Sequence, residues 1–457
     1  MSFNSLIFIL YFLPLTLLIY YVSKEKYRNL ILLLASTIFF LWSSSKSFIV
    51  ILISISINYS LGFLLFKSKK YRKVILTFGL IFNIFLLMYY KYSNFFITTF
   101  NTALKTNISL LNLIVPLGIS YITFQQISFV VDVYKDKTSF KNNLIDYCLY
   151  ILFFPKLIAG PIIKYSQINK SLINRKYSDY MFNAGIYRFS IGLGKKIIIS
   201  STLETIANNI FSLSPSYLGF NLSWLGMITY TLQIYFDFSG YSDMAIGLAN
   251  MFSIPLPENF NKPYQAKGFK DFWKRWHISL SSFLRNYIYI PLGGNRVSKR
   301  RMLFNSFIVF LISGFWHGAN FTFIIWGIYH GFFVIIENLG FNKIYTILPN
   351  IFSKFITFIL VSIGWVFFRS DSLSYAFKFI KELFNFNNIV SLDIINADFK
   401  FLFIFILALI LISLPKININ KNKALFILSR IFSLIILIYS ISIITTGSFM
   451  PFIYLSF

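Results

Sequence analysis

Residues 29–73 read NLILLLASTIFFLWSSSKSFIVILISISINYSLGFLLFKSKKYRK: two apolar runs, a polar turn at 43–47 and a basic cluster at 67–73. Each run approaches the roughly 20 residues that an α-helix needs to cross the hydrocarbon core of a bilayer. Loops rich in Lys and Arg stay on the cytoplasmic side of a membrane. The stretch therefore predicts a hairpin of two membrane helices, and its flanking basic loops, at 24–28 and 67–73, are expected inside the cell.

Apolar runs of the same kind fill most of the chain. They predict an all-α polytopic membrane protein with roughly eleven to thirteen membrane segments, some of them re-entrant where Gly and Pro interrupt a run. Basic residues at 416–423 place the last loop inside, so both termini are expected outside, with an even number of full crossings. The further runs lie at 6–22, 74–90, 111–131, 144–163, 185–206, 222–251, 302–338, 354–368, 400–414 and 424–446.

The composition excludes an ordinary soluble protein. Charged residues are 12% of the chain, against about 25% in globular proteins. The net charge of +27 fits either a nucleic-acid partner or the inner face of a membrane, and the long apolar runs decide for the lipid bilayer and against nucleic acid. One cysteine and three histidines, with no CxxC or HExxH spacing, predict neither a metal site nor a bound cofactor.

The longest polar interruption, at 255–301, carries ten basic and two acidic residues and is expected in the cytoplasm. Within it, residues 271–277 read DFWKRWH, and on a helix Trp273, Trp276 and His277 would share one face. An interfacial anchor of Trp and basic residues is one interpretation. The histidine, and the PLGGNR turn that follows, favour a substrate-binding surface as the other.

His317 lies in an otherwise apolar run. From Met302, just after the Arg300-Arg301 pair, a helix would carry it about 22 Å into a hydrocarbon core about 30 Å thick. An ionisable residue at that depth is by default a functional candidate. The alternative is a neutral histidine hydrogen-bonded between helices, and the glycines at 314 and 318 indicate close helix packing in either case.

Three further ionisable residues interrupt apolar runs. His330 lies about 220° round a helix from His317, which favours a structural role. Asp237 and Asp243 either cap a broken helix or orient a histidine, and the sequence leaves both possibilities open.

The chemistry that these residues support is proton transfer. The chain contains no GxSxG elbow and no Walker loop. A buried histidine can remove the proton of a hydroxyl as a general base. A basic, aromatic loop can hold a phosphate-bearing donor such as a coenzyme A thioester. Together these parts indicate acyl transfer to an alcohol.

Several motifs resemble the membrane-bound O-acyltransferase (MBOAT) family, in its alginate O-acetyltransferase and peptidoglycan O-acetyltransferase branch. They are DFWKRWHISL at 271–280, LRNYIYIPLGGNR at 284–296 and SGFWHG at 313–318. Asn286 departs from the branch, which commonly has Asp there. Shorter stretches that also resemble the branch are PLGIS at 116–120, AGPI at 159–162, YFDFSGYSD at 235–243, GWVFFR at 364–369 and PFIY at 451–454.

The resemblance implies a ring of membrane helices around a central tunnel, in one domain over 1–457. The expected parts are N-terminal helices at 1–110, a core at 111–340 containing the basic segment 255–301, and C-terminal helices at 341–457. It also implies a bacterial inner-membrane enzyme that takes acetyl groups from acetyl-CoA, or another acyl thioester, on the cytoplasmic side. The acceptor would be an extracytoplasmic polysaccharide, reached with the help of an extracytoplasmic acetyltransferase partner.

The family's intramembrane histidine corresponds to His317, and the histidine of its Trp-His motif to His277. We expect His317 to act as general base, with an acyl-histidine intermediate as the alternative, and His277 to position or polarise the donor. The rival functions are D-alanyl transfer to teichoic acid and transport of lipid-linked sugars. Residues expected to bind substrate are Trp273, Lys274, Arg275, Trp276, Arg285, Asn295, Arg296, Trp316 and Asn320, with Asp237 and Asp243 in support.

Overall fold

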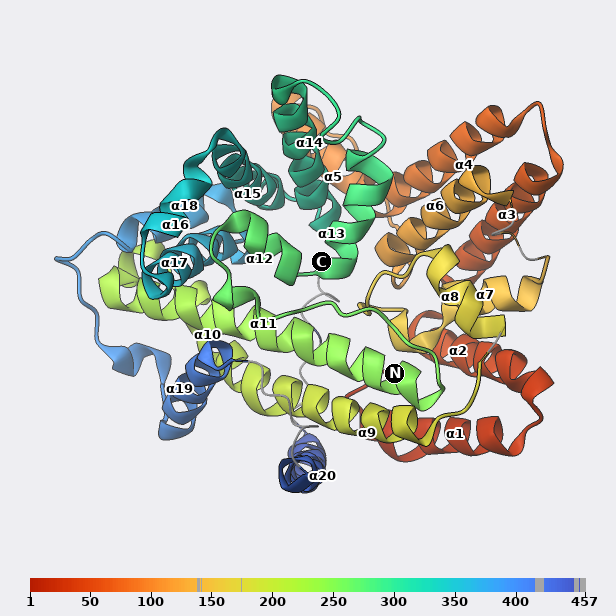
Figure 1. Ribbon diagram of the computed structural model, residues 1–457. Coiled ribbons are helices and arrows are strands. Elements are labelled where there is room, and N and C mark those ends of the chain that lie inside the picture. Colours follow the sequence, from red (N-terminus) through yellow and green to blue (C-terminus); the bar gives the residue numbers. More distant parts are fainter. Residues whose placement is uncertain (138–139, 141, 174, 416–422, 448–451, 453–457) are drawn as a thin grey trace. The chain divides into compact units, whose positions relative to one another are not determined.

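The computed structural model describes residues 1–137, 140, 142–173, 175–415, 423–447 and 452. Over these residues the regular structure is helical, and no strand occurs in them (Figure 1). The chain divides into two compact units, one of residues 1–189 and 244–257 and the other of residues 190–243 and 258–457. The all-α class predicted from the sequence is confirmed. The single domain with three successive parts stays a prediction.

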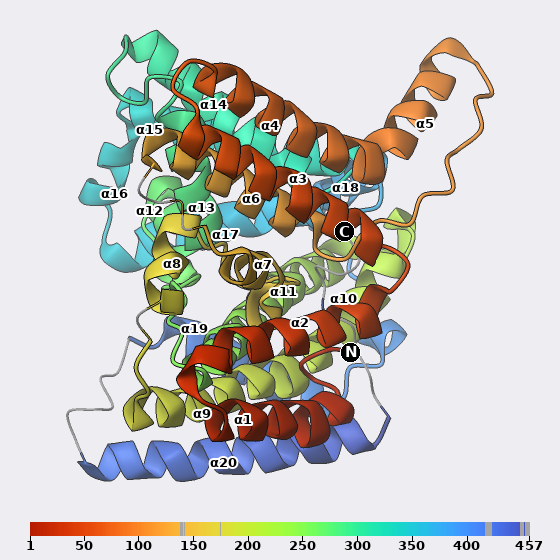
Figure 2. The ribbon, with the colours of Figure 1, turned by 90° about the vertical axis from the view of Figure 1, so that its right-hand side faces the viewer.

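In the first unit, the predicted hairpin forms α2 (Arg28–Ser44) and α3 (Phe48–Lys67). In this unit α3, α4 and α6 lie side by side (Figure 2). Asn58 of α3 and Asn83 of α4 are fully buried and exchange two amide hydrogen bonds, of 3.1 and 2.7 Å. Such pairs join helices where lipid offers no alternative partner. The helices are α1 (Leu13–Val22), α2 (Arg28–Ser44), α3 (Phe48–Lys67), α4 (Arg72–Leu87), α5 (Ser93–Leu104), α6 (Ile119–Lys135), α7 (Leu144–Leu152) and α8 (Tyr165–Ile173).

The second unit holds the three histidines. Two long helices, α9 (Asp179–Gly194) and α11 (Gly219–Met251), contribute residues to both units. A π-helical segment, η6 (Lys195–Ser200), follows α9, and another, η9 (Arg285–Tyr289), follows α13. The other helices are α10 (Ser201–Ser212), α12 (Phe269–Arg275), α13 (Ile278–Leu284), α14 (Lys299–His317), α15 (Phe321–Leu339), α16 (Ile344–Ile347), α17 (Asn350–Arg369), α18 (Leu373–Glu382), α19 (Phe399–Ser413) and α20 (Lys423–Thr445).

The long apolar run at 302–338 forms two helices, as expected. At their contact, a Cβ added to Gly314 of α14 would lie 2.4 Å from the carbonyl oxygen of Phe323, and one added to Gly327 of α15 would lie 2.5 Å from that of Phe310. The two glycines thus let the helix backbones touch. The close packing predicted from Gly314 and Gly318 is found at both, since a Cβ added to Gly318 would lie 2.2 Å from the Phe323 ring, and Gly327 was not predicted. Asn320 ends the turn between the helices, and its side chain caps α15 by accepting from the Thr322 amide.

Six helices of the described residues are long and apolar enough to cross a membrane, and two apolar helices are shorter, at Ile7–Val22 and Phe399–Ser413. The total of eleven to thirteen segments and the outside placement of the termini stay predictions. The basic loop at 416–423 lies outside the described residues except for Lys423, and the motif at 451–454 except for Phe452. The six helices are Glu25–Ser44, Phe48–Lys67, Arg72–Leu104, Phe321–Leu339, Asn350–Arg369 and Ala424–Thr445.

Candidate active site

An aromatic cluster in the second unit connects all three histidines. The ring centroid of Trp316 lies 6.4 Å from that of His277 and 5.0 Å from that of His317. On the other side of His317, the Trp326 ring is 5.0 Å away, and Trp326 lies 4.8 Å from His330. Each of these two tryptophan rings therefore packs against two imidazoles, and together they link the three histidines.

His277 does not continue the helix of the DFWKRWH motif. The α12 helix ends at Arg275, Trp276 is extended, and His277 adopts the left-handed conformation with φ of 43° before α13 begins. The expectation that Trp273, Trp276 and His277 share one helical face is therefore wrong. The backbone turns here because the Ile278 amide donates to the Asn259 carbonyl at 3.0 Å, which starts α13 in a new direction.

The Asn259 side chain fixes the tautomer of His277. Asn259 Oδ1 lies 3.0 Å from His277 Nδ1, and it also accepts from the backbone amide and the hydroxyl of Ser279. A backbone N–H can only donate, so this atom is the amide oxygen and His277 Nδ1 carries the proton. The Asn259 amide group donates in turn to Ser242 Oγ of α11 at 3.1 Å. His277 Nε2 is consequently left with its lone pair.

Burial lowers the pKa of His277 to about 3, so the imidazole is neutral near pH 7. Its Nε2 atom has no hydrogen-bond partner among the described residues. The Phe238 ring packs edge-on against the imidazole at 4.7 Å and carries no polar group. A neutral, buried nitrogen lone pair of this kind can accept a hydrogen bond from a bound molecule.

His317 is the last residue of α14, and its side chain is 5% exposed. In addition to its two tryptophan neighbours, the Phe368 ring of α17 lies 5.2 Å away. The helix runs from Lys299, which agrees with the predicted start near Met302. The imidazole thus stands where α14 breaks at Gly318, inside a wall of aromatic rings.

His330 is fully buried in the middle of α15, and neither ring nitrogen has a hydrogen-bond partner among the described residues. Trp273 and Phe269 of α12 pack against it at 5.2 and 5.4 Å. A Cβ at Gly364 would lie 2.9 Å from Nε2, so this glycine leaves room for the ring. The surroundings are those of a packed core residue, and the structural role stays a prediction.

Glu337 holds α12 against α15. Its carboxylate accepts from the backbone amides of Phe269, at 2.5 Å, and Lys270, at 2.9 Å. The amide of Gly268, which has a φ of 98°, donates to Thr357 Oγ1 at 2.8 Å. A carboxylate at a helix N-terminus satisfies unpaired amides and complements the helix dipole. Glu337 was not predicted, although an acidic residue in the apolar run at 302–338 was a visible signal.

The two aspartates of α11 do not cap a broken helix, because the helix runs unbroken from Gly219 to Met251. Asp237 lies 2.5 Å from the Nζ atom of Lys196, and Asp243 lies 2.6 Å from that of Lys195. The aspartates thus bind α11 to the π-helical segment η6. The other predicted role, orientation of a histidine, stays a prediction, and for His277 the hydrogen bonds described above come from Asn259.

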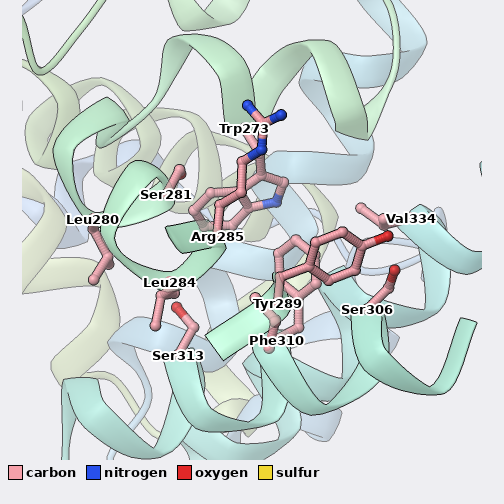
Figure 3. A pocket seen from close by; sticks show the side chains of 11 residues that line it. Trp273, Leu280, Ser281, Leu284, Arg285, Tyr289, Ser306, Phe310, Ser313 and Val334 are labelled. Atoms are coloured by element: carbon pink, nitrogen blue, oxygen red, sulfur yellow. The ribbon is translucent and has the colours of Figure 1, made fainter. Parts of the chain in front are cut away.

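A cavity of about 190 Å³ lies beside the aromatic cluster. Figure 3 shows side chains of α12, α13 and η9 facing those of α14 across it. On α14, Ser306, Phe310 and Ser313 share a helical face that leads to His317 one turn further on. The Trp273 Nε1–H group at the cavity has no acceptor among the described residues. The lining consists of Trp273, Leu280, Ser281, Leu284, Arg285, Tyr289, Ser306, Val309, Phe310, Ser313 and Val334.

The other predicted site residues divide into three groups. Trp273, Trp276 and Trp316 belong to the buried aromatic cluster, and Arg285 joins Trp273 at the cavity. Lys274, Asn295 and Arg296 have exposed side chains. Two others are used locally: Arg275 forms an ion pair with Asp271 at 2.8 Å, and the Asn320 amide donates to the Asp371 carbonyl at 3.0 Å.

A sequence model of the membrane-bound O-acyltransferase family, MBOAT, matches residues 6–368. The chain belongs to this family. It is 40% identical over 395 residues to a probable alginate O-acetylase AlgI of Pseudomonas aeruginosa, which covers 84% of this chain and 75% of that relative. It is 39% identical over 424 residues to a peptidoglycan O-acetyltransferase of Helicobacter pylori, covering 85% of this chain and 80% of that relative. A teichoic acid D-alanyltransferase of Bacillus subtilis is 33% identical over 276 residues, covering 56% and 69%.

The protein is therefore a multi-pass membrane O-acyltransferase, and the resemblance found in the sequence is confirmed. The MBOAT match includes the whole of α12, α13, α14 and α15, which carry all three histidines. It ends at Phe368, the residue whose ring packs against His317. Asn259, Glu337 and Trp326 are the residues of this MBOAT site that the sequence did not single out.

Proposed function

We propose that this enzyme transfers an acetyl group from a cytoplasmic acyl thioester, with acetyl-CoA as donor, to a hydroxyl of an extracytoplasmic polysaccharide. An extracytoplasmic acetyltransferase partner would deliver the group to the glycan. The similarity to enzymes named for alginate and peptidoglycan O-acetylation supports this choice, because it extends over about 85% of the chain. Similarity to a D-alanyltransferase covers 56% of it.

The observation that carries the proposal is that two buried imidazoles share one aromatic neighbour. The Trp316 ring centroid lies 6.4 Å from that of His277 and 5.0 Å from that of His317. In the reaction proposed here, the oxygen of the acceptor hydroxyl attacks the thioester carbonyl while His317 accepts the proton of that hydroxyl. The carbon–sulfur bond then breaks, and the leaving thiolate takes the proton back from His317. Two histidines that both pack against Trp316 can act on the two reactants, one on the hydroxyl and the other on the thioester.

The protonation state of His277 suits positioning of the thioester donor better than polarisation of its carbonyl group. A neutral imidazole that donates through Nδ1 to Asn259 offers only a lone pair at Nε2. Polarising a carbonyl requires a donor, whereas an amide N–H of a pantetheine arm requires an acceptor. We therefore assign His277 the role of accepting a hydrogen bond from the donor.

The cavity beside α14 is proposed as the place of the thioester arm. Its lining is mostly apolar, and its volume of about 190 Å³ suits a slender chain and a short acyl group. The indole N–H of Trp273 supplies a donor there, and Arg285 supplies a positive charge. Exposed basic and polar residues of the same segment, Lys274, Asn295 and Arg296, are proposed to meet the donor's phosphates. Arg275 is proposed to support that surface, and Asn320, in the turn at the other end of α14, is proposed to support the substrate near His317.

The test uses protein purified in nanodiscs and acetyl-CoA labelled in the acetyl group. Wild-type protein should release coenzyme A and, with the extracytoplasmic partner added, pass label to a soluble glycan acceptor, and His317→Ala should do neither while remaining folded. His317→Gln is the matched polar variant and should also be inactive. Full activity of either variant would refute the general-base role. If the protein releases carrier protein from a D-alanyl thioester and does not cleave acetyl-CoA, D-alanyl transfer is favoured. If it cleaves no thioester at all, a sugar transporter is favoured.

The location proposed is the bacterial cytoplasmic membrane, with both termini extracytoplasmic. Basic loops at 24–28 and 67–73 support this orientation, because such loops remain inside. Alkaline phosphatase fused at the C-terminus should be active in intact cells. The same fusion after residue 70 should be inactive.

A further inference from the structure

A polar pocket of about 480 Å³ lies in the first unit, which contains no histidine. Its wall combines the start of α2, the start of α7 and the segment that follows α8. Three basic residues and two acidic residues line it, a surplus of one positive charge. The lining consists of Glu25, Lys26, Arg28, Asn29, Leu30, Asn143, Ile145, Asp146, Leu172, Ile173 and Arg175.

Two arginines of this pocket are held against one tyrosine ring. The guanidinium carbons of Arg28 and Arg175 each lie 5.3 Å from the ring centroid of Tyr20. The Tyr20 hydroxyl donates to the Phe252 carbonyl at 3.0 Å, which fixes the ring. Two like charges gathered around one ring repel each other, so an anion between them would relieve the repulsion.

Both guanidinium groups retain donors that the described residues do not use. Arg28 Nε and Arg175 Nε and Nη1 are buried and have no hydrogen-bond partner there. The guanidinium nitrogens that do have partners are Arg28 Nη1, 3.3 Å from Glu25, and Arg175 Nη2, 2.7 Å from Asn29 Oδ1. Buried donors are nearly always paired in folded proteins, so a missing acceptor is indicated.

The acidic residues of the pocket do not supply that acceptor. Asp146 Oδ1 accepts from Asn29 at 2.6 Å, and its Oδ2 accepts from Asn143 at 2.8 Å. The Glu25 side chain is 79% exposed and reaches only one nitrogen of Arg28. Asp146 is thus directed elsewhere, and Glu25 leaves the three buried donors of Arg28 and Arg175 without an acceptor among the described residues.

We propose that this pocket binds a phosphate oxyanion through Arg28, Arg175 and Lys26. The planar guanidinium fork matches the geometry of phosphate oxygens, and lysine adds a point charge. Two sources share this chemistry: the headgroup of an anionic phospholipid, and a phosphate on a soluble molecule. The site is separate from the proposed acyl transfer, because binding here requires no histidine and no thioester.

The test measures binding rather than activity. Purified full-length protein is delipidated and equilibrated with vesicles of phosphatidylcholine containing phosphatidylglycerol, and retained lipid is identified by native mass spectrometry. In a second arm, inorganic phosphate is titrated into protein in detergent at constant ionic strength, and the thermal midpoint is followed. The variants are Arg175→Gln and Arg28→Gln. The control is Lys69→Gln, an exposed residue of the other basic loop.

Retention of phosphatidylglycerol by wild-type protein, weakened about tenfold by Arg175→Gln and unchanged by Lys69→Gln, identifies a lipid site. Stabilisation by inorganic phosphate with the same variant pattern identifies a free phosphate site. Lys26→Gln, at an exposed position, should weaken binding several-fold even if the arginine variants fail to fold. The proposal is overturned if wild-type protein shows neither effect, or if Lys69→Gln reduces binding as much as Lys26→Gln does.

Discussion

The Nδ1 atom of His277 lies 3.0 Å from Asn259 Oδ1, and the same oxygen accepts from two groups of Ser279. One amide thereby fixes both the proton position on the imidazole and the start of α13. Asn259 is a positioning residue, since it acts through His277. The relationship gives the first prediction.

Replacing Asn259 with Leu should raise the KM for the thioester about tenfold or more, with a smaller change in kcat. The variant removes the acceptor that holds Nδ1–H, and a lost hydrogen bond of this kind corresponds to about 1–3 kcal/mol. Steady-state kinetics over a range of donor concentrations would measure it. In the double variant with His277→Ala the losses should not add, because both act through one imidazole. Additive losses would contradict the assignment.

Stability should depend on pH through His277. Its native pKa is about 3, whereas an unfolded histidine titrates near 6.5, so the unfolded state binds more protons between these values. The stabilisation is fully present above pH 6.5 and is lost as the pH falls towards 3. The slope approaches about 1.4 kcal/mol per pH unit well below 6.5. Thermal midpoints measured between pH 7 and 5 should fall less steeply for His277→Asn than for wild type, and equal slopes would count against a neutral native histidine.

The carboxylate of Glu337 should stabilise the fold by fixing α12. Glu337→Ala leaves the amides of Phe269 and Lys270 without their acceptor and should lower the free energy of unfolding by about 1–3 kcal/mol. Glu337→Gln keeps one acceptor oxygen, so its free energy of unfolding should lie between those of Glu337→Ala and wild type. Asp371→Asn, at an exposed position, is the matched control and should change little. The free energies of unfolding of the three variants are compared by chemical denaturation in the same detergent. Identical denaturation curves for all three would show that the Glu337 carboxylate does not stabilise the fold.

Replacement of His330 should mainly reduce stability, whereas replacement of His317 should mainly reduce acetyl transfer. His330→Asn should lower thermal stability, because it disrupts a fully buried aromatic environment, and it should retain measurable acetyl transfer. His317→Ala should abolish transfer with a smaller loss of stability. Parallel assays of midpoint and turnover separate the two. Complete inactivity of a well-folded His330→Asn protein would assign His330 to the reaction as well.

The close contact of α14 and α15 gives the last prediction. A methyl group at Gly314 would lie 2.4 Å from the Phe323 carbonyl oxygen, which belongs to the backbone and cannot rotate away. Gly314→Ala should therefore destabilise the protein by about 1–3 kcal/mol or more, as overpacked cores do. Gly331→Ala, on the same hairpin, meets only side-chain atoms, of which the nearest is Phe310 Cβ at 3.1 Å, and should be milder. Equal losses of stability in Gly314→Ala and Gly331→Ala would show that α14 and α15 can move apart at Gly314.

Apolar runs and basic clusters were enough to predict most helices, because each run must satisfy its own backbone in lipid. The histidines at 277 and 317 were also visible, since ionisable groups are costly in such runs. Sequence spacing could not predict that α12 ends at Arg275, because the turn depends on Asn259, eighteen residues before His277. Nor could it pair Asp237 with Lys196, which lies on another helix. Those contacts arise only once separate elements pack together.

The buried pair of Asn58 and Asn83 bears on how the protein is made. The two residues are 25 positions apart, and each amide nitrogen also donates to a carbonyl of its own helix, whereas each amide oxygen accepts only from the other helix. A ribosome completes α3 before it completes α4, so the Asn58 oxygen has no donor until α4 is made. Departure of the first helix into lipid by itself would expose this amide oxygen to hydrocarbon. The pair therefore favours release of α3 and α4 from the insertion machinery together, as one preassembled unit.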